Sequence, residues 1–579
     1  MKATQLCQAN PTNTQPLAPR LRSLWPRPHR GAPGTSSRIQ RPANSRLQPA
    51  MVLPDGVVLQ GFHWESSTPD CRDPSQWPEG RVTSSWYSTV EAKVEDIRKA
   101  GFSDVWLPPP SESVAKEGYL PTKLYNLNSA YGNASQLRSL LQTLHGEGVG
   151  AILDVVVNHR CGDQQDEEGR WVLYSDELGH DNRRVDWGPW ALVSNHPDPN
   201  LAGTGNPKDE YVYHAAPNVD HSNQEVRDSI KSWLNFMTRP RNLGYSSLRF
   251  DFVLGYGAKY VKEYVDSTVY PRGELCIGEY WDGNDGKDPA YTNTEMLLNW
   301  AEKVDGHCGV FDFALKAVLH KAALTEDWSL LGSASDGHPG LMGARPELAF
   351  TFVDNHDTAC PQAHFPFPEN SSKLLAVYAY LLSHPGIPVI FWLHLYGKKN
   401  ASGLTNGKEP DVSLTEADGR MDLRNTWAPP TNPGFSWEES HPGHEPWSVE
   451  SQDGVQGPIY TGICGEEIKK MVQARRDSGV HSTSKVRVVS SSKDLYHAVV
   501  TGRTVYGSSR SGGSEASDTL VREIVVMIGP KAREQAAGPG LELISSGALH
   551  AFYTCVTPTV PGHGVENLDE AHPHTIKVN

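Results

Sequence analysis

The sequence predicts an α/β protein whose main domain is a (β/α)8 barrel, the TIM-barrel fold. Short apolar runs recur eight times between residues 55 and 395, and amphipathic helical patterns separate them. Strands that alternate with helices imply a parallel sheet, and eight such units allow the sheet to close. The expected strands are Val57–Phe62, Asp104–Pro108, Ala151–Asn158, Ser247–Phe252, Leu275–Glu279, Val310–Phe313, Leu348–Val353 and Ile387–Trp392.

The helical patterns each have one apolar face. Leu137, Leu140, Leu141 and Leu144 follow the i, i+3, i+4, i+7 spacing, and Gly146 ends the pattern. A helical pattern resumes over residues 466–476, where it would supply the eighth helix. We therefore expect the barrel to comprise residues 55–395 together with 462–481.

Two long segments interrupt the barrel, and a segment with a different hydrophobic pattern follows it. Residues 159–220, after the third strand, are too long for a simple loop and are expected to form a small subdomain at the mouth of the barrel. Residues 396–461 are rich in Pro and Gly and are expected to be an irregular insertion. Alternating apolar runs over 482–558 predict an antiparallel β domain, with a tail at 559–579.

The charge balance argues against nucleic acid as a partner. The 53 Lys and Arg residues face 68 Asp and Glu residues, and the formal net charge of −15 would repel a polyanion. No stretch approaches the roughly 20 consecutive apolar residues that span a bilayer, so we expect no membrane partner. We expect the protein to act as a monomer.

Residues 1–54 contain eight basic residues and no acidic one. An Arg-rich, acid-free leader without an apolar core is typical of an organellar transit peptide, which predicts a plastid location. The alternative is a disordered tail that precedes the true start at Met51, and the protein would then be cytoplasmic.

Polar side chains cluster where the expected strands end. The active sites of barrels of this kind lie at the carboxyl ends of the strands. The residues placed there are Asp154, Asn158 and His159 at the end of the third strand, Arg249 and Asp251 on the fourth, Glu279 on the fifth, and His356 and Asp357 at the end of the seventh.

Three of these carboxyl groups have the properties needed to cleave a glycosidic bond. Arg249 and Asp251 are two residues apart and share a face of their strand, so the Arg should keep Asp251 ionised as a nucleophile. Glu279 follows an apolar run and precedes aromatic residues, which should raise its pKa and keep it protonated as an acid. Asp357 could stabilise a positively charged transition state. An Asp–Arg pair alone is more often structural.

The segments ILDVVVNHR, GYSSLRFDF, GEYWD and FTFVDNHDT, in this order, resemble the α-amylase family of retaining glycoside hydrolases, and most closely its plant-type members. The resemblance covers roughly residues 57–395 and 462–556. It implies that Asp251 is the nucleophile, Glu279 the acid/base and Asp357 the transition-state stabiliser. It also implies that the sugar is bound by Tyr119, His159, Arg249, Trp281 and His356.

The activity implied is endo-acting hydrolysis of α-1,4-glucosidic bonds in starch or related α-glucans by a retaining double displacement. Two alternatives stay open. One is a transglycosylase of the same family, which would use a sugar acceptor instead of water. The other is a non-hydrolytic glucan-binding or regulatory relative, against which the intact carboxyl trio argues.

The resemblance also implies a Ca²⁺ site between the inserted subdomain and the barrel. Asn158 matches a side-chain ligand and Gly255 a carbonyl ligand. Lys208 and Asn218, however, stand where the family has Asp ligands, and lysine cannot coordinate a cation. We therefore expect a weakened calcium site made by Asn158, Asn218, Gly255 and, displaced by one position, Asp209.

Overall fold

The computed structural model describes residues 56–67, 85–175, 185–208, 210–284, 286–359, 362–368, 370–396, 464–506, 519–534 and 540–558. The expected leader 1–54 and tail 559–579 lie outside these ranges, as does the expected insertion beyond residue 396.

Eight parallel strands close into a barrel in the order β1-β10-β9-β8-β7-β6-β5-β2. They are β1 (Val58–Gln60), β2 (Asp104–Trp106), β5 (Gly150–Val155), β6 (Ser247–Phe250), β7 (Cys276–Gly278), β8 (Gly309–Phe311), β9 (Ala349–Phe352) and β10 (Ile387–Phe391). Val58 of β1 pairs with Asp104 of β2 on one side and Val389 of β10 on the other, which closes the ring. The predicted barrel and its eight strands are confirmed.

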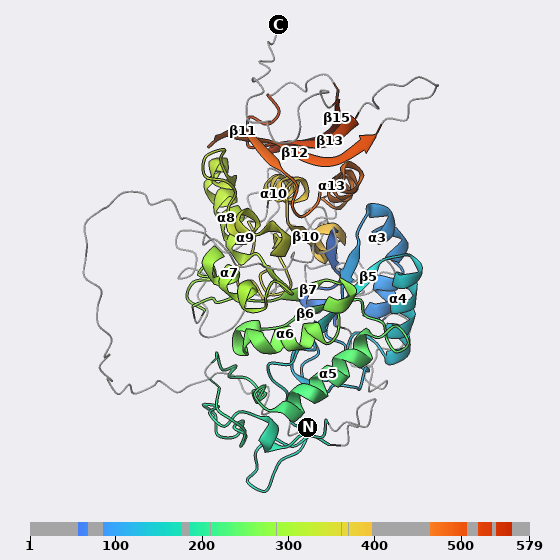
Figure 1. Cartoon of the computed structure of the whole chain (residues 1–579), viewed down its shortest axis with the longest axis vertical. Helices are drawn as coiled ribbons and strands as arrows, with labels where there is room; N and C mark the ends of the chain where they lie inside the picture. The colour runs from blue at the N-terminus through green and yellow to red at the C-terminus, as the bar shows by residue number, and fades with distance from the viewer. Residues whose placement is uncertain are drawn as a thin grey trace, which may run out of the picture.

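Helices surround the barrel (Figure 1). They are α2 (Trp86–Glu91), α3 (Val94–Ala100), α4 (Ala134–Gly146), α5 (Gln224–Thr238), α6 (Ala258–Asp266), α7 (Thr294–Lys303), α8 (Phe313–Thr325), α9 (Gly340–Ala344), α10 (Ser371–Ser383), α11 (Trp392–Tyr396) and α13 (Gly465–Ser478). The four leucines predicted to share a face are the buried residues of α4, which Asn133 and Gln136 cap. Helix α13 is the predicted eighth helix. No helix among the described residues has the length and hydropathy needed to cross a membrane.

The segment after β5 contains little regular structure, as the prediction of an irregular subdomain requires. Its described part has one short 3₁₀ helix, η3 (Pro189–Ala191), and isolated bridges such as His159–Asn218. The buried Arg160 donates to the carbonyl oxygens of Thr122 and Val185, so it binds the subdomain to the loop before α4. That loop forms the hairpin β3 (Glu112–Ser113) and β4 (Pro121–Lys123). The remaining 3₁₀ helices are η1 (Trp64–Ser66), η4 (Val253–Gly255), η5 (Tyr270–Arg272), η6 (Trp328–Leu331) and η7 (Pro346–Leu348).

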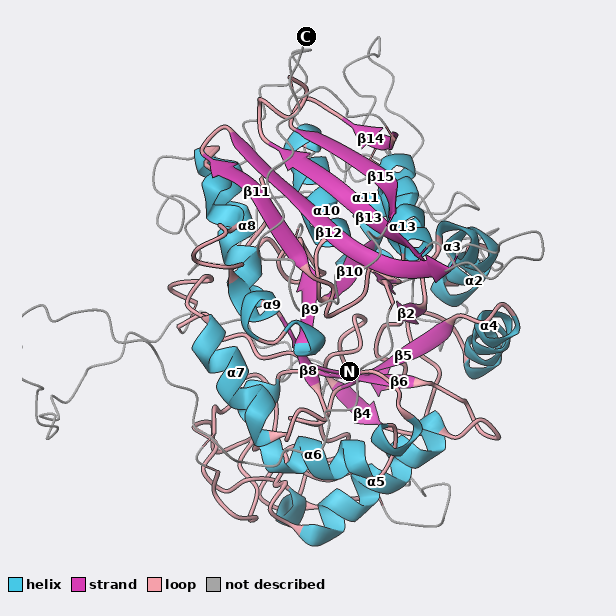
Figure 2. Ribbon diagram, turned by 45° about the horizontal axis from the view of Figure 1, so that its top comes forward, coloured by secondary structure: helices cyan, strands magenta, loops and turns pink. Residues whose placement is uncertain are grey.

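A five-stranded antiparallel sheet follows the barrel, as predicted, in the order β11-β12-β13-β15-β14. Its strands are β11 (Val486–Ser492), β12 (Leu495–Tyr506), β13 (Thr519–Ile528), β14 (Leu541–Ser546) and β15 (His550–Pro558). One face lies over α10 and α13 (Figure 2). Tyr496 of β12 is fully buried there, and its hydroxyl lies 2.8 Å from Nε2 of His384 at the end of α10. The sheet is thus fixed to the barrel by a polar contact as well as by apolar packing.

Candidate active site

The carboxyl ends of β5, β6 and β7 bring three acidic side chains onto one guanidinium group. Nη1 of the fully buried Arg249 donates to Oδ1 of Asp154 and Oδ1 of Asp251, each at 2.8 Å. Its Nη2 lies 2.8 Å from Oε1 of Glu279, as an ion pair. In the sheet Asp154 pairs directly with Arg249, so both side chains project into the barrel.

The backbone after β6 is strained. Phe252, which follows Asp251, has φ +48°, a left-handed conformation that is unusual for a bulky side chain. In this conformation its N–H donates to Oε2 of Glu279 at 3.1 Å. Backbone strain of about 1–3 kcal/mol persists only where surrounding interactions compensate for it. Here the strained turn connects Asp251, the predicted nucleophile, with Glu279, the predicted acid/base.

Four carboxyl groups share the one Arg249 charge, because Asp357 lies close enough to interact with the other three. Burial and then Glu279, Asp154 and Asp357 raise the pKa of Asp251 well above its ordinary value, although Arg249 opposes the shift. Burial and Glu279 raise the pKa of Asp357 to about 8. The expectation that Arg249 keeps Asp251 ionised did not include burial or the three other carboxyl groups, which oppose it. The protonation of Asp251 is therefore coupled to that of Asp357.

His356 and Tyr119 form a stacked pair beside this cluster. Their ring centroids are 5.1 Å apart and nearly parallel, and Trp64 stacks on Tyr119 at 6.1 Å. Burial holds the pKa of His356 well below its ordinary range, so the ring is neutral. Nε2 of Gln60 lies 3.0 Å from Nδ1 of His356, so the ring proton of His356 is favoured on its own Nε2. That nitrogen lies 3.2 Å from Oδ2 of Asp357. His356 thus donates to Asp357.

His159 and Trp281 are held by contacts within the protein. Nε2 of His159 lies 2.7 Å from the Tyr119 carbonyl oxygen, and its ring stacks on Tyr213 at 4.2 Å. Burial lowers the pKa of His159 to about 4. Trp281 stacks on Phe313 at 4.9 Å and donates to the Pro289 carbonyl oxygen. Their sugar-binding roles stay predictions.

Asp154 was placed at the strand ends from the sequence, but no catalytic or binding role was predicted for it. Its side chain is fully buried, and Oδ2 accepts from Trp106 Nε1 at 3.1 Å and from the Tyr119 hydroxyl at 2.9 Å. A single carboxylate inside the apolar run AILDVVV was the signal for it, since burying a charge is costly unless it is paired.

Replacing Asp154 with Asn is expected to move the acidic limb of kcat/KM to lower pH by about one unit. The negative charge of Asp154 raises the pKa of Asp251. Without it Asp251 loses its proton at lower pH, so the ionised form that acts as the nucleophile is available at lower pH. The pH profile of kcat/KM reports the free enzyme. A slower variant with an unmoved limb would contradict this electrostatic role.

Three of the residues predicted to bind calcium, Asn158, Asn218 and Gly255, come together around the ammonium group of Lys208. Nζ of Lys208 lies 2.7 Å from Oδ1 of Asn218, 2.7 Å from the carbonyl oxygen of Gly255 and 3.3 Å from Oδ1 of Asn158. Burial lowers the pKa of Lys208 to about 8, so it remains mostly protonated at neutral pH. Asp209, the expected compensating ligand, lies outside the described residues. The described donors do not fit a calcium ion, and no group of three His, Cys, Asp or Glu among the described residues could hold a metal.

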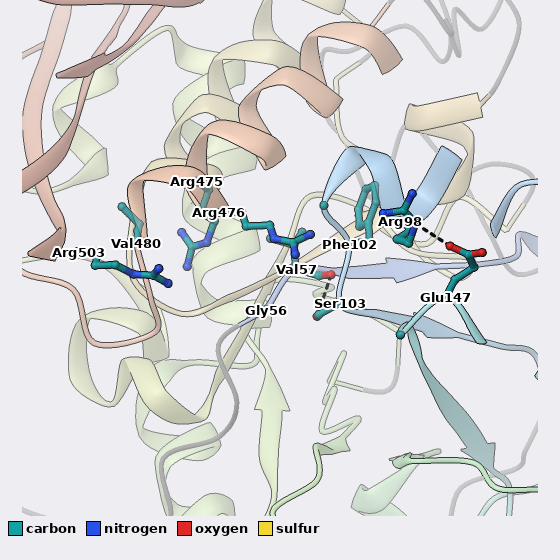
Figure 3. A pocket seen from close by; sticks show the side chains of 13 residues that line it. Gly56, Val57, Arg98, Phe102, Ser103, Glu147, Arg475, Arg476, Val480 and Arg503 are labelled. Carbon is teal, nitrogen blue, oxygen red and sulfur yellow. Dashed lines mark hydrogen bonds and ion pairs between the residues drawn. The ribbon is translucent and has the colours of Figure 1, made fainter. Parts of the chain in front are cut away.

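A pocket of about 450 Å³ lies at the opposite end of the barrel, beside residues that precede β1 and β2 (Figure 3). Arg98, Arg475, Arg476 and Arg503 line it. Arg98 pairs with Glu147, and Arg475 donates to carbonyl oxygens at the end of α10 and beyond it. None of the candidate catalytic residues borders this pocket.

Comparison with known sequences gives a consistent result. The sequence profile described as the alpha amylase catalytic domain matches residues 87–441. "Alpha-amylase 3, chloroplastic" of Arabidopsis thaliana is 37% identical over 350 residues, which are 59% of this chain and 36% of that protein. "Probable alpha-amylase 2" of the same plant is 37% identical over 360 residues, 61% of this chain and 79% of the relative. The chain thus spans about a third of the length of the first relative and most of the second.

Solved structures share the fold at low sequence identity. A cyclic alpha-maltosyl-(1→6)-maltose hydrolase from Arthrobacter globiformis superposes with a TM-score of 0.51 and 16% identity, over 88% of this chain and 99% of the other. A cyclomaltodextrin glucanotransferase gives a TM-score of 0.51 and 17% identity, over 87% of this chain and all of the other.

Proposed function

This chain belongs to the alpha-amylase family, and from that premise we propose that it hydrolyses internal α-1,4-glucosidic bonds of starch or related α-glucans with retention of configuration. The observation that carries the proposal is the arrangement of Asp251 and Glu279 on the two terminal nitrogens of Arg249. Retaining enzymes need two carboxyl groups about 5–5.5 Å apart, and two groups that share one guanidinium are held close together.

In the first step, a carboxylate oxygen of Asp251 attacks the anomeric carbon while Glu279 gives its proton to the departing glycosidic oxygen. The bond to that oxygen breaks, and a glycosyl ester forms on Asp251. In the second step Glu279 takes a proton from water, whose oxygen displaces Asp251 from the same carbon. Arg249, whose terminal nitrogens lie 2.8 Å from Asp251 and from Glu279, balances the negative charge of Asp251 when it acts as the nucleophile.

The remaining residues are proposed to hold the sugar. Asp357, with His356 donating to it, can accept sugar hydroxyls and stabilise positive charge on the ring. The stacked rings of Trp64, Tyr119 and His356 provide an apolar wall against which a pyranose can lie. Arg249 fixes the carboxylates, while His159 and Trp281 would border the sugar from neighbouring loops.

The decisive experiment follows the products from maltoheptaose and soluble starch by NMR in the presence of labelled maltose. We expect new reducing ends that first appear as the α-anomer, and rapid loss of starch chain length. Initial β-anomer would rule out the retaining mechanism. Transfer of the labelled maltose into longer chains would favour the transglycosylase. The solved glucanotransferase shares only its fold with this chain. Starch binding without cleavage would favour the non-hydrolytic relative.

We also propose a plastid location for the protein. The acid-free leader supports it, and a relative that is 37% identical is named chloroplastic. Residues 1–55 fused to a fluorescent protein are expected to direct it into plastids, whereas the chain from Met51 onward should stay in the cytosol. A cytosolic signal from both fusions would favour Met51 as the true start.

A further inference from the structure

The ammonium group of Lys208 lies in a cradle of oxygen atoms contributed by three separate parts of the chain. Asn158 follows barrel strand β5, Gly255 ends η4 after β6, and Asn218 belongs to the inserted subdomain, as does Lys208 itself. The three contacts satisfy the three N–H donors of one ammonium group. The cradle therefore connects the subdomain to the ends of two barrel strands.

Contacts that do not involve the ammonium group help to hold the cradle in place. Nδ2 of the fully buried Asn218 donates to the carbonyl oxygens of Tyr213 and Ala216, so Oδ1 must face Lys208. A Cβ at position 255 would collide with Oδ1 of Asn158, so only glycine allows this close approach.

The backbone of Lys208 is fixed as well. Its N–H donates to Oδ1 of Asn195, and its carbonyl oxygen accepts from Nδ2 of the same side chain at 2.7 Å. Both the backbone and the ammonium group of Lys208 are thus held in place. A solvated surface lysine has no such constraints.

The chemistry of the cradle suits one positive charge and not two. Ca²⁺ requires six to eight oxygen ligands, several of them carboxylates, at about 2.3–2.6 Å. The described cradle offers three neutral oxygens at hydrogen-bonding distances from nitrogen. The two departures from the family pattern together replace the charge of a bound cation, because Lys208 supplies a fixed positive charge and Asn218 removes a negative one.

We propose that the Lys208 ammonium is a built-in cation that joins the inserted subdomain to the barrel and makes the fold independent of calcium. The link also stabilises the active-site side of the barrel, because Asn158 immediately precedes His159 and Nδ2 of Asn158 contacts the His159 ring nitrogen at 3.2 Å. The proposal concerns stability and does not depend on the catalytic assignment.

The first test compares thermal unfolding of the full chain in EDTA with unfolding in millimolar CaCl₂, together with calorimetric titration of CaCl₂ into protein stripped with EDTA. We expect the same melting temperature in both conditions and no saturable heat. A melting temperature that rises with CaCl₂ to a plateau would overturn the proposal, since ligands that bind only the native state stabilise it.

The second test removes the charge and keeps the shape. Lys208→Met is expected to lower the melting temperature by several degrees in EDTA, because the carbonyl oxygen of Gly255 loses its Lys208 donor and Oδ1 of Asn218 keeps the N–H of Tyr213 but loses the ammonium group. Lys123→Met is the matched control, since Lys123 lies on β4 near the subdomain and, among the described residues, its ammonium group forms a long 3.7 Å ion pair with Asp163. Equal melting temperatures for Lys208→Met and the wild type would overturn the proposal.

The third test reverses the exchange. The double variant Lys208→Asp with Asn218→Asp offers carboxylates to the same cradle and is expected to melt at a higher temperature in CaCl₂ than in EDTA. Because the wild-type comparison needs no variant, the proposal remains testable even if the double variant folds poorly. A double variant that folds and stays indifferent to CaCl₂ would count against a cation cradle at this position.

Discussion

Asp251→Asn is expected to lower turnover of soluble starch by roughly four orders of magnitude or more, because an amide cannot form the glycosyl ester. The amide oxygen can still accept from Nη1 of Arg249, so the fold should persist. Removing one of four crowded carboxyl groups also relieves repulsion, and the melting temperature should be unchanged or higher. Initial rates and thermal unfolding on the same preparation measure both effects.

Two controls make this prediction specific. Asp282→Asn changes an acidic residue in the loop after β7, where its side-chain oxygen accepts from the backbone of Asn284 among the described residues, and it should keep near-normal activity. Azide, a small external nucleophile, should partly restore bond cleavage in Asp251→Asn and give a glycosyl azide of inverted configuration. Near-normal starch hydrolysis by Asp251→Asn would remove the nucleophile assignment.

Glu279→Gln is expected to reduce starch turnover by roughly a thousand-fold or more, because the leaving oxygen is no longer protonated. The loss should be much smaller for aryl maltooligosaccharides, because their phenol leaves in the first step without being protonated. Gln can still accept from the N–H of Phe252, which preserves the turn after β6. Initial rates on both substrates separate an acid from a residue that only supports the structure.

The matched control lies at the other end of the same strand. Glu274 precedes β7, on the side of the barrel away from the cluster, and Glu274→Gln should leave both rates nearly unchanged. An equal loss on starch and on the activated substrate in Glu279→Gln would contradict the acid/base role.

Much of the fold was predictable because it depends on periodicity. Each barrel strand is a short apolar run, and each helix such as α4 repeats one buried face, so local sequence identifies both. The strand ends then located Arg249, Asp251 and Glu279, since parallel strands in a barrel share one catalytic end. No long-range information was needed for these predictions.

What the sequence did not predict depends on distances between segments. The pKa of Asp251 reflects burial and three other carboxyl groups, whereas the sequence shows only the neighbouring Arg249. Lys208 could be identified as a residue that cannot coordinate calcium, but its flexible chain gives no indication of where the ammonium lies. Only the folded chain shows that it reaches Asn158, Asn218 and Gly255.

The pairing of β1 with β10 has a consequence for synthesis on the ribosome. Strand β1 is made first, yet one of its edges stays open until Val389 has left the exit tunnel. Throughout that interval the growing sheet has two unpaired edges, which are templates for pairing with another nascent chain. Nascent chains that stop before β10 should therefore aggregate or recruit chaperones, and completion of a single strand should abolish that tendency.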